Sequence, residues 1–294
     1  MINVDIVCPV YKNIEQVKRI LNCLKHQEDI NISKIVCSHT LCEDENVDNE
    51  IRDILKQNNV VSFELELDEF SHSLTRQKAI EEYTNEDIVI FCSQDIIFYD
   101  NKAIYKLASK INDEVVYAYG KQICTKHNIE RYIRSKNYGD EDIIVSKDDI
   151  ESMQIMAFFA SDAFSAIKRD VFIRVGGYKN FDLMMNEDQL YAKIILDAGY
   201  KKMYVSDAIC EHSHKYTLKQ LYKRYYEAGK FYKTVTLFNS YKTDSSGFAL
   251  AMYVLKKALI HFDILVLLRW PFDMAARYFG LKKGQHYKTK KENN

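Results

Sequence analysis

Apolar residues occur with two alternating spacings along the first hundred residues of the chain. Some runs are continuously apolar or alternate with polar residues, which is typical of β-strands, and others repeat every three or four positions, which is typical of helices. This alternation predicts a parallel sheet with helices on both faces and ligands at the carboxyl ends of its strands. The predicted strands are 4–9, 35–37, 60–67 and 87–92, and the predicted helices are 14–24, 51–55 and 74–83.

The rest of the chain shows the same two spacings less regularly. A polar segment rich in Lys, Asn and Asp, residues 121–150, is interpreted as a mobile loop or insertion rather than core. After Thr217 the pattern is helical up to a polar end, residues 285–294, which we expect to be a disordered tail. Further strands are expected at 115–119, 163–167 and 203–212, and a helix at 187–198.

Charge separates the C-terminal third from the rest of the chain. The net charge of −1 combines −12 over residues 1–200 with +11 over residues 201–294. A basic end indicates an anionic partner, such as an anionic membrane surface or a diphosphate, or else a solvated surface. Apolar residues between Phe248 and Leu259 surround two lysines, which suits an amphipathic helix lying on a membrane. The alternative is a stripe that packs on the rest of the protein or forms a homodimer.

Composition narrows the classes of protein that remain. The seven cysteines include no C-x-x-C pair, which argues against a disulfide framework or zinc site and predicts a cytoplasmic location. The first residues do not resemble a signal peptide, and charged residues interrupt the longest apolar stretch, so no membrane span is expected. The basic residues form no recognisable nucleic-acid-binding module, so no nucleic acid is expected as a partner.

Two groups of polar residues in the first half could carry chemistry. Asp95 follows the predicted strand 87–92, where its carboxylate could hold a metal ion, although an Asp there more often caps a turn. His72 and Arg76 lie four residues apart at the start of a helix. This position favours phosphate binding, but an ordinary surface pair has the same spacing.

Two further groups lie in the second half. Glu187 and Asp188 follow Asn186, a fair N-cap, in the first turn of a helix and flank its apolar stripe. Acids are ordinary in a first turn, but two inward carboxylates are costly without a task. His212 and His214 would share one face of a strand, which makes a metal site about as plausible as a structural role.

Seven short segments follow one another in a fixed order along nearly the whole chain. They are 5–12 (Asp-Ile-Val-Cys-Pro-Val-Tyr-Lys), 70–77 (Phe-Ser-His-Ser-Leu-Thr-Arg-Gln), 91–95 (Phe-Cys-Ser-Gln-Asp), 164–178, 187–188, 207–214 and 275–284. In this order they resemble the motifs of the GT-A glycosyltransferases of family 2, and of their rhamnosyltransferase branch in particular.

This resemblance implies an α/β fold of the GT-A type, which is a Rossmann-like, mostly parallel sheet with flanking helices, plus a C-terminal helical extension. A catalytic domain would cover 1–215, with a nucleotide-sugar half at 1–100 and an acceptor half at 101–215. The helical region at 216–284 would associate with a membrane or a partner.

The resemblance also implies an inverting transfer of one sugar with the help of Mn²⁺ or Mg²⁺. Asp188 would be the base that deprotonates the acceptor hydroxyl, and Glu187 would orient the acceptor or Asp188. The metal would be held by Asp95 with His212, and His214 would support the ligand or contact the diphosphate. The alternative is that His214 is the ligand. The nucleotide-diphospho-sugar donor would contact Pro9, Tyr11, His72, Arg76, Ser93, Gln94, Asp95 and Arg224.

The branch resemblance points to rhamnose from dTDP-rhamnose, with a UDP-linked sugar as the alternative. The acceptor would be a lipid-linked saccharide of bacterial cell-surface polysaccharide, and the protein would be peripheral on the inner face of the cell membrane. The spacing from Gln220 to Arg224 is one residue longer than the Q-x-x-R-W motif of processive synthases, which favours single transfer.

Two departures from the family pattern leave a second interpretation open. Ser93 stands where the D-x-D motif has its first acid, and Ser38-His39-Thr40 stands where the family has an acid after its second strand. A degenerate scaffold subunit of a glycan assembly complex, without turnover, is therefore the alternative function.

Overall fold

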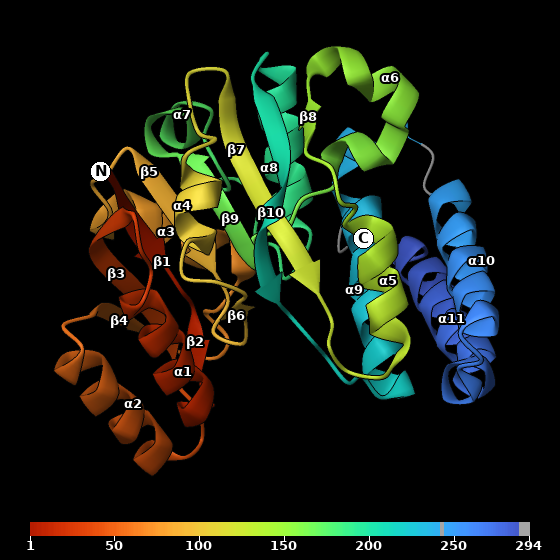
Figure 1. The fold of residues 1–294 in the computed structure, drawn as a ribbon, viewed down its shortest axis with the longest axis horizontal. Coiled ribbons are helices and arrows are strands. Elements are labelled where there is room, and N and C mark those ends of the chain that lie inside the picture. The colour runs from red at the N-terminus through yellow and green to blue at the C-terminus, as the bar shows by residue number, and fades with distance from the viewer. Residues whose placement is uncertain (242–243, 288–294) are drawn as a thin grey trace, which may run out of the picture.

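A mixed β-sheet forms the centre of the computed structural model (Figure 1). The structure describes residues 1–241 and 244–287, and for residues 244–246 it describes only the backbone. The strands are β1 (Ile2–Val7), β2 (Val10–Tyr11), β3 (Ile30–Thr40), β4 (Val61–Leu65), β5 (Ile88–Cys92), β6 (Ile97–Phe98), β7 (Val115–Ile123), β8 (Ile143–Val145), β9 (Phe164–Lys168) and β10 (Lys201–Glu211). The helices are α1 (Ile14–Lys25), α2 (Glu45–Gln57), α3 (His72–Tyr83), α4 (Ala103–Ala108), α5 (Ile129–Asn137), α6 (Ile150–Met153), α7 (Arg169–Arg174), α8 (Glu187–Asp197), α9 (Leu218–Thr234), α10 (Asp244–Ile260) and α11 (Ile264–Gln285).

The sheet has the order β2-β3-β1-β5-β9-β7-β10-β6, with β4 beside β3 and β8 beside β10. Strands β3, β1 and β5 are parallel, as are β7 and β10, and β9 lies between β5 and β7 and is antiparallel to both. The carboxyl ends of β1, β3, β5, β7 and β10 therefore meet at one edge of the sheet. The predicted α/β fold with a mostly parallel sheet is confirmed.

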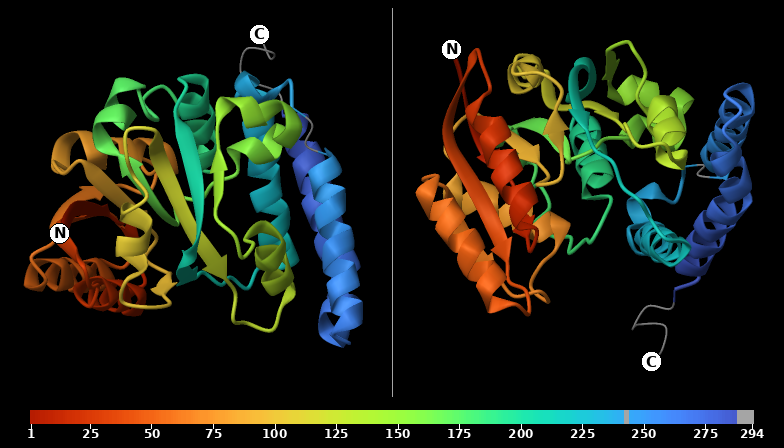
Figure 2. Two further views of the ribbon diagram at one scale, coloured as in Figure 1. Left: turned by 45° about the horizontal axis from the view of Figure 1, so that its top comes forward. Right: turned by 60° about the horizontal axis from the view of Figure 1, so that its bottom comes forward.

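Side chains of the central strands alternate between two apolar cores. Val4 and Ile6 of β1 pack with α1, α2 and α4, whereas Val7 of β1 and Phe91 of β5 pack on the opposite face with α3, α7 and α8. A period of two along each strand produces this division. Figure 2 shows helices on both sides of the strands.

Residues 121–150 form ordered elements, so the prediction of a mobile loop is wrong. The segment contains the end of β7, helix α5 and strand β8. Ile129, Tyr132 and Ile133 of α5 are buried. Their spacing of three and four positions is helical, but many charged neighbours obscured this signal.

Helices α9 and α11 pack with their backbones in contact at glycines. A Cβ added to Gly284 would lie 2.1 Å from a backbone oxygen of α9, and one added to Gly229 would lie 2.1 Å from a backbone oxygen of α11. Arg277 of α11 also pairs with Glu130 of α5 at 2.7 Å. The C-terminal helices are therefore held against each other and against α5.

Some side chains of the apolar stripe predicted on α10 pack against other helices, and others are exposed to solvent. Leu250, Val254 and Ala258 pack with α5 and α11, but Phe248 and Leu259 are 71% and 54% exposed. Among the described residues, no helix has the length and hydropathy that crossing a bilayer requires. Of the predicted disordered tail, Gln285 ends α11, and residues 288–294 lie outside the described residues.

Candidate active site

Asp95, His212 and His214 meet where β5 and β10 end. Oδ2 of Asp95 lies 3.5 Å from Nε2 of His212 and 3.8 Å from Nδ1 of His214. One ligand atom from each of these three residues lies within 4.8 Å of the other two. Strand β6 pairs with β10 and holds the two loops together, because Glu211 lies opposite Ile97. The structure brings together the residues that the sequence suggests as metal ligands.

These three side chains fit a divalent cation. Burial lowers the pKa of His212 and lowers the pKa of His214 to about 4, so both imidazoles are neutral and can offer a lone pair. Burial of Asp95 opposes ionisation, but the contact with His212 outweighs burial and lowers the pKa of Asp95 to about 2, so its carboxylate is ionised. A carboxylate with two imidazoles suits Mn²⁺ or another first-row divalent metal.

Gln122 orients the imidazole of His212 through a hydrogen bond at Nδ1. Its Oε1 lies 2.9 Å from Nδ1 of His212 and accepts from Nη1 of Arg134, while its Nε2 donates to Ser161 at 2.7 Å. A carboxamide oxygen that accepts from Nδ1–H leaves Nε2 of His212 unprotonated toward Asp95. The sequence does not mark Gln122 as a site residue, because it lies in the segment 121–150 that the sequence predicts to be a loop.

One cavity of about 380 Å³ lies beside this cluster, at the ends of β1, β2 and β5. It gathers side chains from three motifs that are far apart in the sequence. The residues predicted to bind the donor that line it are Pro9, Tyr11, His72, Arg76, Ser93, Gln94 and Asp95.

Gln94 binds the neighbouring backbone in addition to lining this cavity. Its Oε1 accepts from the backbone N of Tyr11 at 2.8 Å, and its Nε2 donates to the backbone O of Tyr11 at 3.0 Å. The two bonds fix strand β2 against the loop after β5. Gln94 therefore positions Tyr11 at the wall of the cavity.

Arg224 lies outside the 380 Å³ cavity. It is exposed on α9, 5.7 Å from the ring centre of Tyr216, and lines a second cavity of about 560 Å³ together with Asp188. Burial is the largest cause of the lowered pKa of His212 and of His214, and the charge of Arg224 is a smaller cause in the same direction. Arg224 therefore places positive charge on the α9 side of the cluster.

Arg76 is committed to another residue of the chain. Its Nη1 donates to Oε1 of Glu187 at 2.9 Å and to the backbone O of His72 at 3.0 Å. The side chains of Arg76 and Glu187 are only 3% and 7% exposed. This buried ion pair joins α3 to α8.

Asp188, which follows Glu187 in the chain, is half-buried and lines the 560 Å³ cavity. Among the described residues its side chain accepts one hydrogen bond, from the backbone N of Gln189 at 2.7 Å, and forms no ion pair. Burial and the charges of Glu187 and Asp162 raise the pKa of Asp188 well above its usual range. Such a carboxylate is suited to accept a proton near neutral pH.

The start of α8 differs from the sequence-based expectation. The side chain of Asn186 makes no capping hydrogen bond, and its φ of +62° lies in the left-handed region. Asparagine tolerates this conformation better than most residues do. The predicted N-cap interaction is therefore wrong, and a left-handed turn precedes Glu187 instead.

Asp162 is a buried carboxylate that the sequence pattern does not predict. It accepts hydrogen bonds from Tyr117 at 2.7 Å, from Tyr178 at 2.5 Å and from Ser165 at 2.8 Å. Its charge contributes to the raised pKa of Asp188. No local pattern marks it, because two of its three partners lie 45 and 16 positions away.

Comparison with curated proteins finds two bacterial relatives, whereas no protein-family profile matches the chain. The chain is 36% identical over 167 residues to the O-antigen chain rhamnosyltransferase WbaN of Salmonella anatum, covering 56% of this chain and 53% of that protein. It is 30% identical over 232 residues to the O-antigen chain rhamnosyltransferase RfbN of Salmonella typhimurium, covering 78% of this chain and 72% of that protein. The aligned part thus spans about half of WbaN and nearly three quarters of RfbN.

Solved structures share the fold at low sequence identity. The mannosyltransferase PcManGT from Pyrobaculum calidifontis, in complex with GDP-Man and Mn²⁺, matches with a TM-score of 0.54 and 12% identity over 99% of this chain and 77% of that chain. TarS 1-349 of S. aureus, in complex with UDP-GlcNAc, matches with a TM-score of 0.57 and 12% identity over 94% of this chain and 79% of that chain.

Proposed function

The chain belongs to the family of GT-A glycosyltransferases that includes the O-antigen chain rhamnosyltransferases WbaN and RfbN, and on this premise we propose that it transfers a single sugar from a nucleotide-diphospho-sugar to a hydroxyl of a lipid-linked saccharide. Rhamnose from dTDP-rhamnose is the donor we expect. The acceptor is a precursor of cell-surface polysaccharide, and the reaction takes place at the cytoplasmic face of the membrane.

One observation carries this proposal: two adjacent carboxylates differ in their partners. Glu187 forms an ion pair with Arg76, whereas Asp188 has no cationic partner among the described residues and lines a cavity. In the proposed reaction Asp188 takes the proton from the acceptor hydroxyl. The hydroxyl attacks C1 of the sugar opposite the nucleotide, so the configuration at C1 inverts.

The donor occupies the 380 Å³ cavity in this proposal, with its diphosphate toward Asp95. Arg224 and Arg134 supply positive charge near the cluster. Burial and the charges of Arg76 and Arg224 lower the pKa of His72 to about 3. His72 is therefore neutral and contacts the donor through a hydrogen bond rather than through charge.

Asp95, His212 and His214 would hold Mn²⁺ or Mg²⁺, which when bound supplies positive charge to the departing nucleoside diphosphate. Gln122 keeps His212 in the tautomer that a ligand needs. Glu187 stays paired with Arg76 and fixes the start of α8, where Asp188 lies.

Transfer assays with a lipid-linked saccharide acceptor test the proposal. dTDP-rhamnose with Mn²⁺ should give a product whose anomeric configuration, measured by nuclear magnetic resonance, is inverted relative to the donor. UDP-linked sugars serve as the comparison set. A protein that binds a nucleotide sugar but transfers sugar from none of them would support the scaffold interpretation instead.

A further inference from the structure

The turn between α10 and α11 exposes a concentration of large apolar side chains. We call this set the hydrophobic tip. Each member is between 54% and 86% exposed. The hydrophobic tip consists of Leu259, Ile260, Phe262, Ile264, Leu265 and Leu268.

The backbone at the hydrophobic tip is strained in a way that presents Phe262 to solvent. Phe262 has a φ of +50° and is 86% exposed. A bulky side chain rarely adopts this left-handed conformation, and such strain concentrates at functional positions. Asp263 caps α11 and pairs with Arg131 of α5 at 2.5 Å, so the turn is anchored on its inner side.

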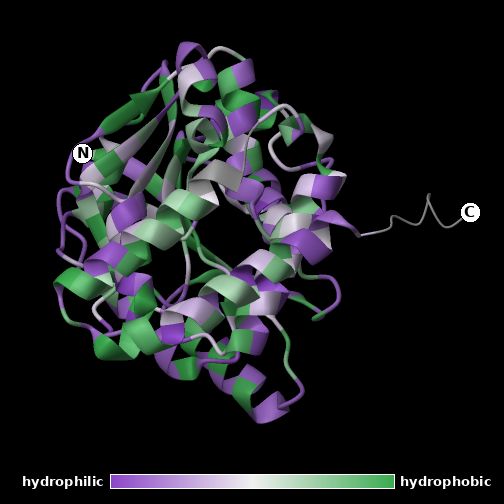
Figure 3. Cartoon of the chain, turned by 90° about the vertical axis from the view of Figure 1, so that its right-hand side faces the viewer, coloured by the Kyte–Doolittle hydropathy of each residue, from purple (hydrophilic) through white to green (hydrophobic). Residues whose placement is uncertain are grey.

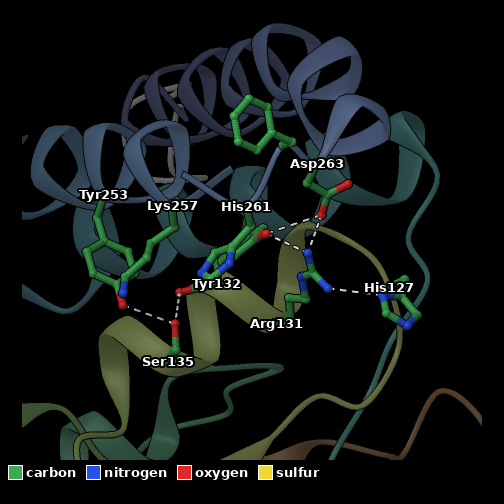
Figure 4. A pocket seen from close by; sticks show the side chains of 9 residues that line it. His127, Arg131, Tyr132, Ser135, Tyr253, Lys257, His261 and Asp263 are labelled. Carbon is green, nitrogen blue, oxygen red and sulfur yellow. Dashed lines mark hydrogen bonds and ion pairs between the residues drawn. The ribbon is translucent and has the colours of Figure 1, made fainter. Parts of the chain in front are cut away.

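A basic and aromatic cavity adjoins the hydrophobic tip, and Figure 4 shows its two walls. Tyr253 and Lys257 of α10, and His261 directly after it, face the side chains of α5 across the cavity. The α5 side contributes His127, Arg131, Tyr132 and Ser135. Phe262 and Asp263, whose carboxylate pairs with Arg131, complete the lining of the cavity, which measures about 720 Å³.

Charge decides which partner covers this surface. From 247 to 285 the chain has six lysines and arginines but only two acids, Asp263 and Asp273, and both acids pair with arginines. In Figure 3, which faces this side of the molecule, hydrophilic and hydrophobic residues are interspersed along the ribbons. A second copy would bring the same positive charges together, whereas an anionic bilayer matches both the apolar and the basic residues.

The hydrophobic tip lies close to the candidate active site. Asn128, at the start of α5, donates to the backbone O of His214 at 3.0 Å, and Arg131, one turn later, binds Asp263. Figure 1 and the left view of Figure 2 show the α10–α11 turn at the end of the molecule toward which the arrowheads of β7 and β10 point. A surface bound at the hydrophobic tip therefore lies beside the strand ends that carry the site.

We propose that the hydrophobic tip inserts into the headgroup region of an anionic phospholipid bilayer, with Lys256, Lys257 and the adjoining basic cavity facing the lipid phosphates. Membrane insertion would bring the candidate active site to a lipid-linked acceptor, and only this link to the acceptor rests on the proposed function. Insertion itself depends on the apolar and basic residues and not on glycosyl transfer.

Vesicle binding by the full chain tests the proposal, with phosphatidylcholine vesicles alone and mixed with phosphatidylglycerol. Replacing Phe262→Ser together with Leu265→Ser should reduce the partition coefficient about tenfold or more, because two apolar side chains lose burial. Lys256→Gln with Lys257→Gln should reduce binding to the anionic vesicles about fivefold per lysine at low salt and less at high salt. The matched controls are Tyr99→Ser, which removes a side chain that is 70% exposed elsewhere, and Lys25→Gln on α1; both should bind as the wild type does.

Three results would overturn the proposal. They are wild-type protein that binds neither vesicle, a Phe262→Ser/Leu265→Ser variant that binds as the wild type does, and a dimer, detected by light scattering, that this same double variant dissociates. Thermal midpoints confirm that each variant is folded. Transfer to a water-soluble acceptor should be unchanged in all variants, and loss of transfer in the wild type would count against the proposed function without affecting the vesicle result.

Discussion

Nη1 of Arg76 donates to Oε1 of Glu187 at 2.9 Å across the interface between α3 and α8. This bond gives two consecutive carboxylates different environments, because Glu187 is paired with a guanidinium and Asp188 is not. The charge of Glu187 also contributes to the raised pKa of Asp188. A single buried ion pair therefore fixes the helix start and helps to set the basicity of the neighbouring side chain.

With Asp188 as the proposed base, Asp188→Asn should lower kcat by about 10² to 10⁴ while donor affinity barely changes, because a base would contact the acceptor and not the diphosphate. The same change should raise the thermal midpoint at neutral pH. The pKa of Asp188 is raised in the folded state, so its ionisation lowers the free energy of unfolding as pH rises above the unfolded value. The stabilisation by Asn should therefore grow with pH from about 4 upward.

Measuring kcat and the thermal midpoint on one sample separates catalysis from structure. The matched control is Asp182→Asn, which neutralises an exposed carboxylate a few residues earlier and should leave both quantities unchanged. Near-normal kcat with a lowered midpoint in Asp188→Asn would remove Asp188 from the mechanism.

Arg76→Met should destabilise the protein by about 3–5 kcal/mol, because Glu187 would be left buried without its partner. Urea unfolding measures this loss. The control is Arg174→Met, which breaks the exposed pair with Asp170 and should cost about 1 kcal/mol or less. If Arg76→Met keeps full stability and loses only donor affinity, Arg76 serves the diphosphate rather than the fold.

Asp95→Asn should abolish metal-dependent donor binding and leave the fold intact, because Asp95 is the one carboxylate in the cluster. Calorimetric titration with Mn²⁺, followed by the donor, measures both affinities. Asp53→Asn on the surface of α2 is the control and should titrate as the wild type does. Unchanged Mn²⁺ and donor affinities in Asp95→Asn would refute the assignment.

Gln122→Leu should weaken Mn²⁺ binding by about 10- to 100-fold, because His212 would lose the acceptor that fixes its tautomer. The same titration with Mn²⁺ measures the loss. Gln122→Glu retains an acceptor at that position and should recover most of the affinity. Equal losses in both variants would mean that Gln122 acts through packing alone.

Asp162→Asn should move the acidic limb of the kcat profile to lower pH. The Asp162 charge is one cause of the raised pKa of Asp188, so removing it lowers that pKa and keeps the base ionised further into acid. The pH dependence of kcat under saturating donor measures the shift. A limb that stays in place, in a variant with a normal thermal midpoint, would separate Asp162 from the titration of Asp188.

Periodicity predicted most of the fold because its signal is local. The helix expected at 14–24 is α1, Ile14–Lys25, and the strand expected at 87–92 is β5, Ile88–Cys92. Helix α5 was missed because charged residues outnumber its three buried apolar side chains. A helix that contributes one narrow stripe to the core carries a weak pattern in the sequence.

Site residues that belong to a contiguous motif could be predicted from the sequence, whereas contacts between residues far apart in the sequence could not. Asp95 and His212 each belong to a short segment with a recognisable order, and the structure places them 3.5 Å apart. Gln122 meets His212 across 90 positions, and Arg76 meets Glu187 across 111. Only the folded chain shows that the guanidinium expected to face the donor is held by a carboxylate.

The first turn of α5 has a geometric consequence for the choice of acceptor. Asn128 holds the loop of His214, and Arg131, three residues later, holds Asp263 at the α10–α11 turn. Three helical residues rise only about 4.5 Å, so the spacing between these two anchor points is short and stiff. If the turn rests in a bilayer, α5 fixes the distance between the candidate active site and the lipid phosphates. Acceptors would then be selected by how many sugar units separate their hydroxyl from the lipid, as well as by the identity of the last sugar.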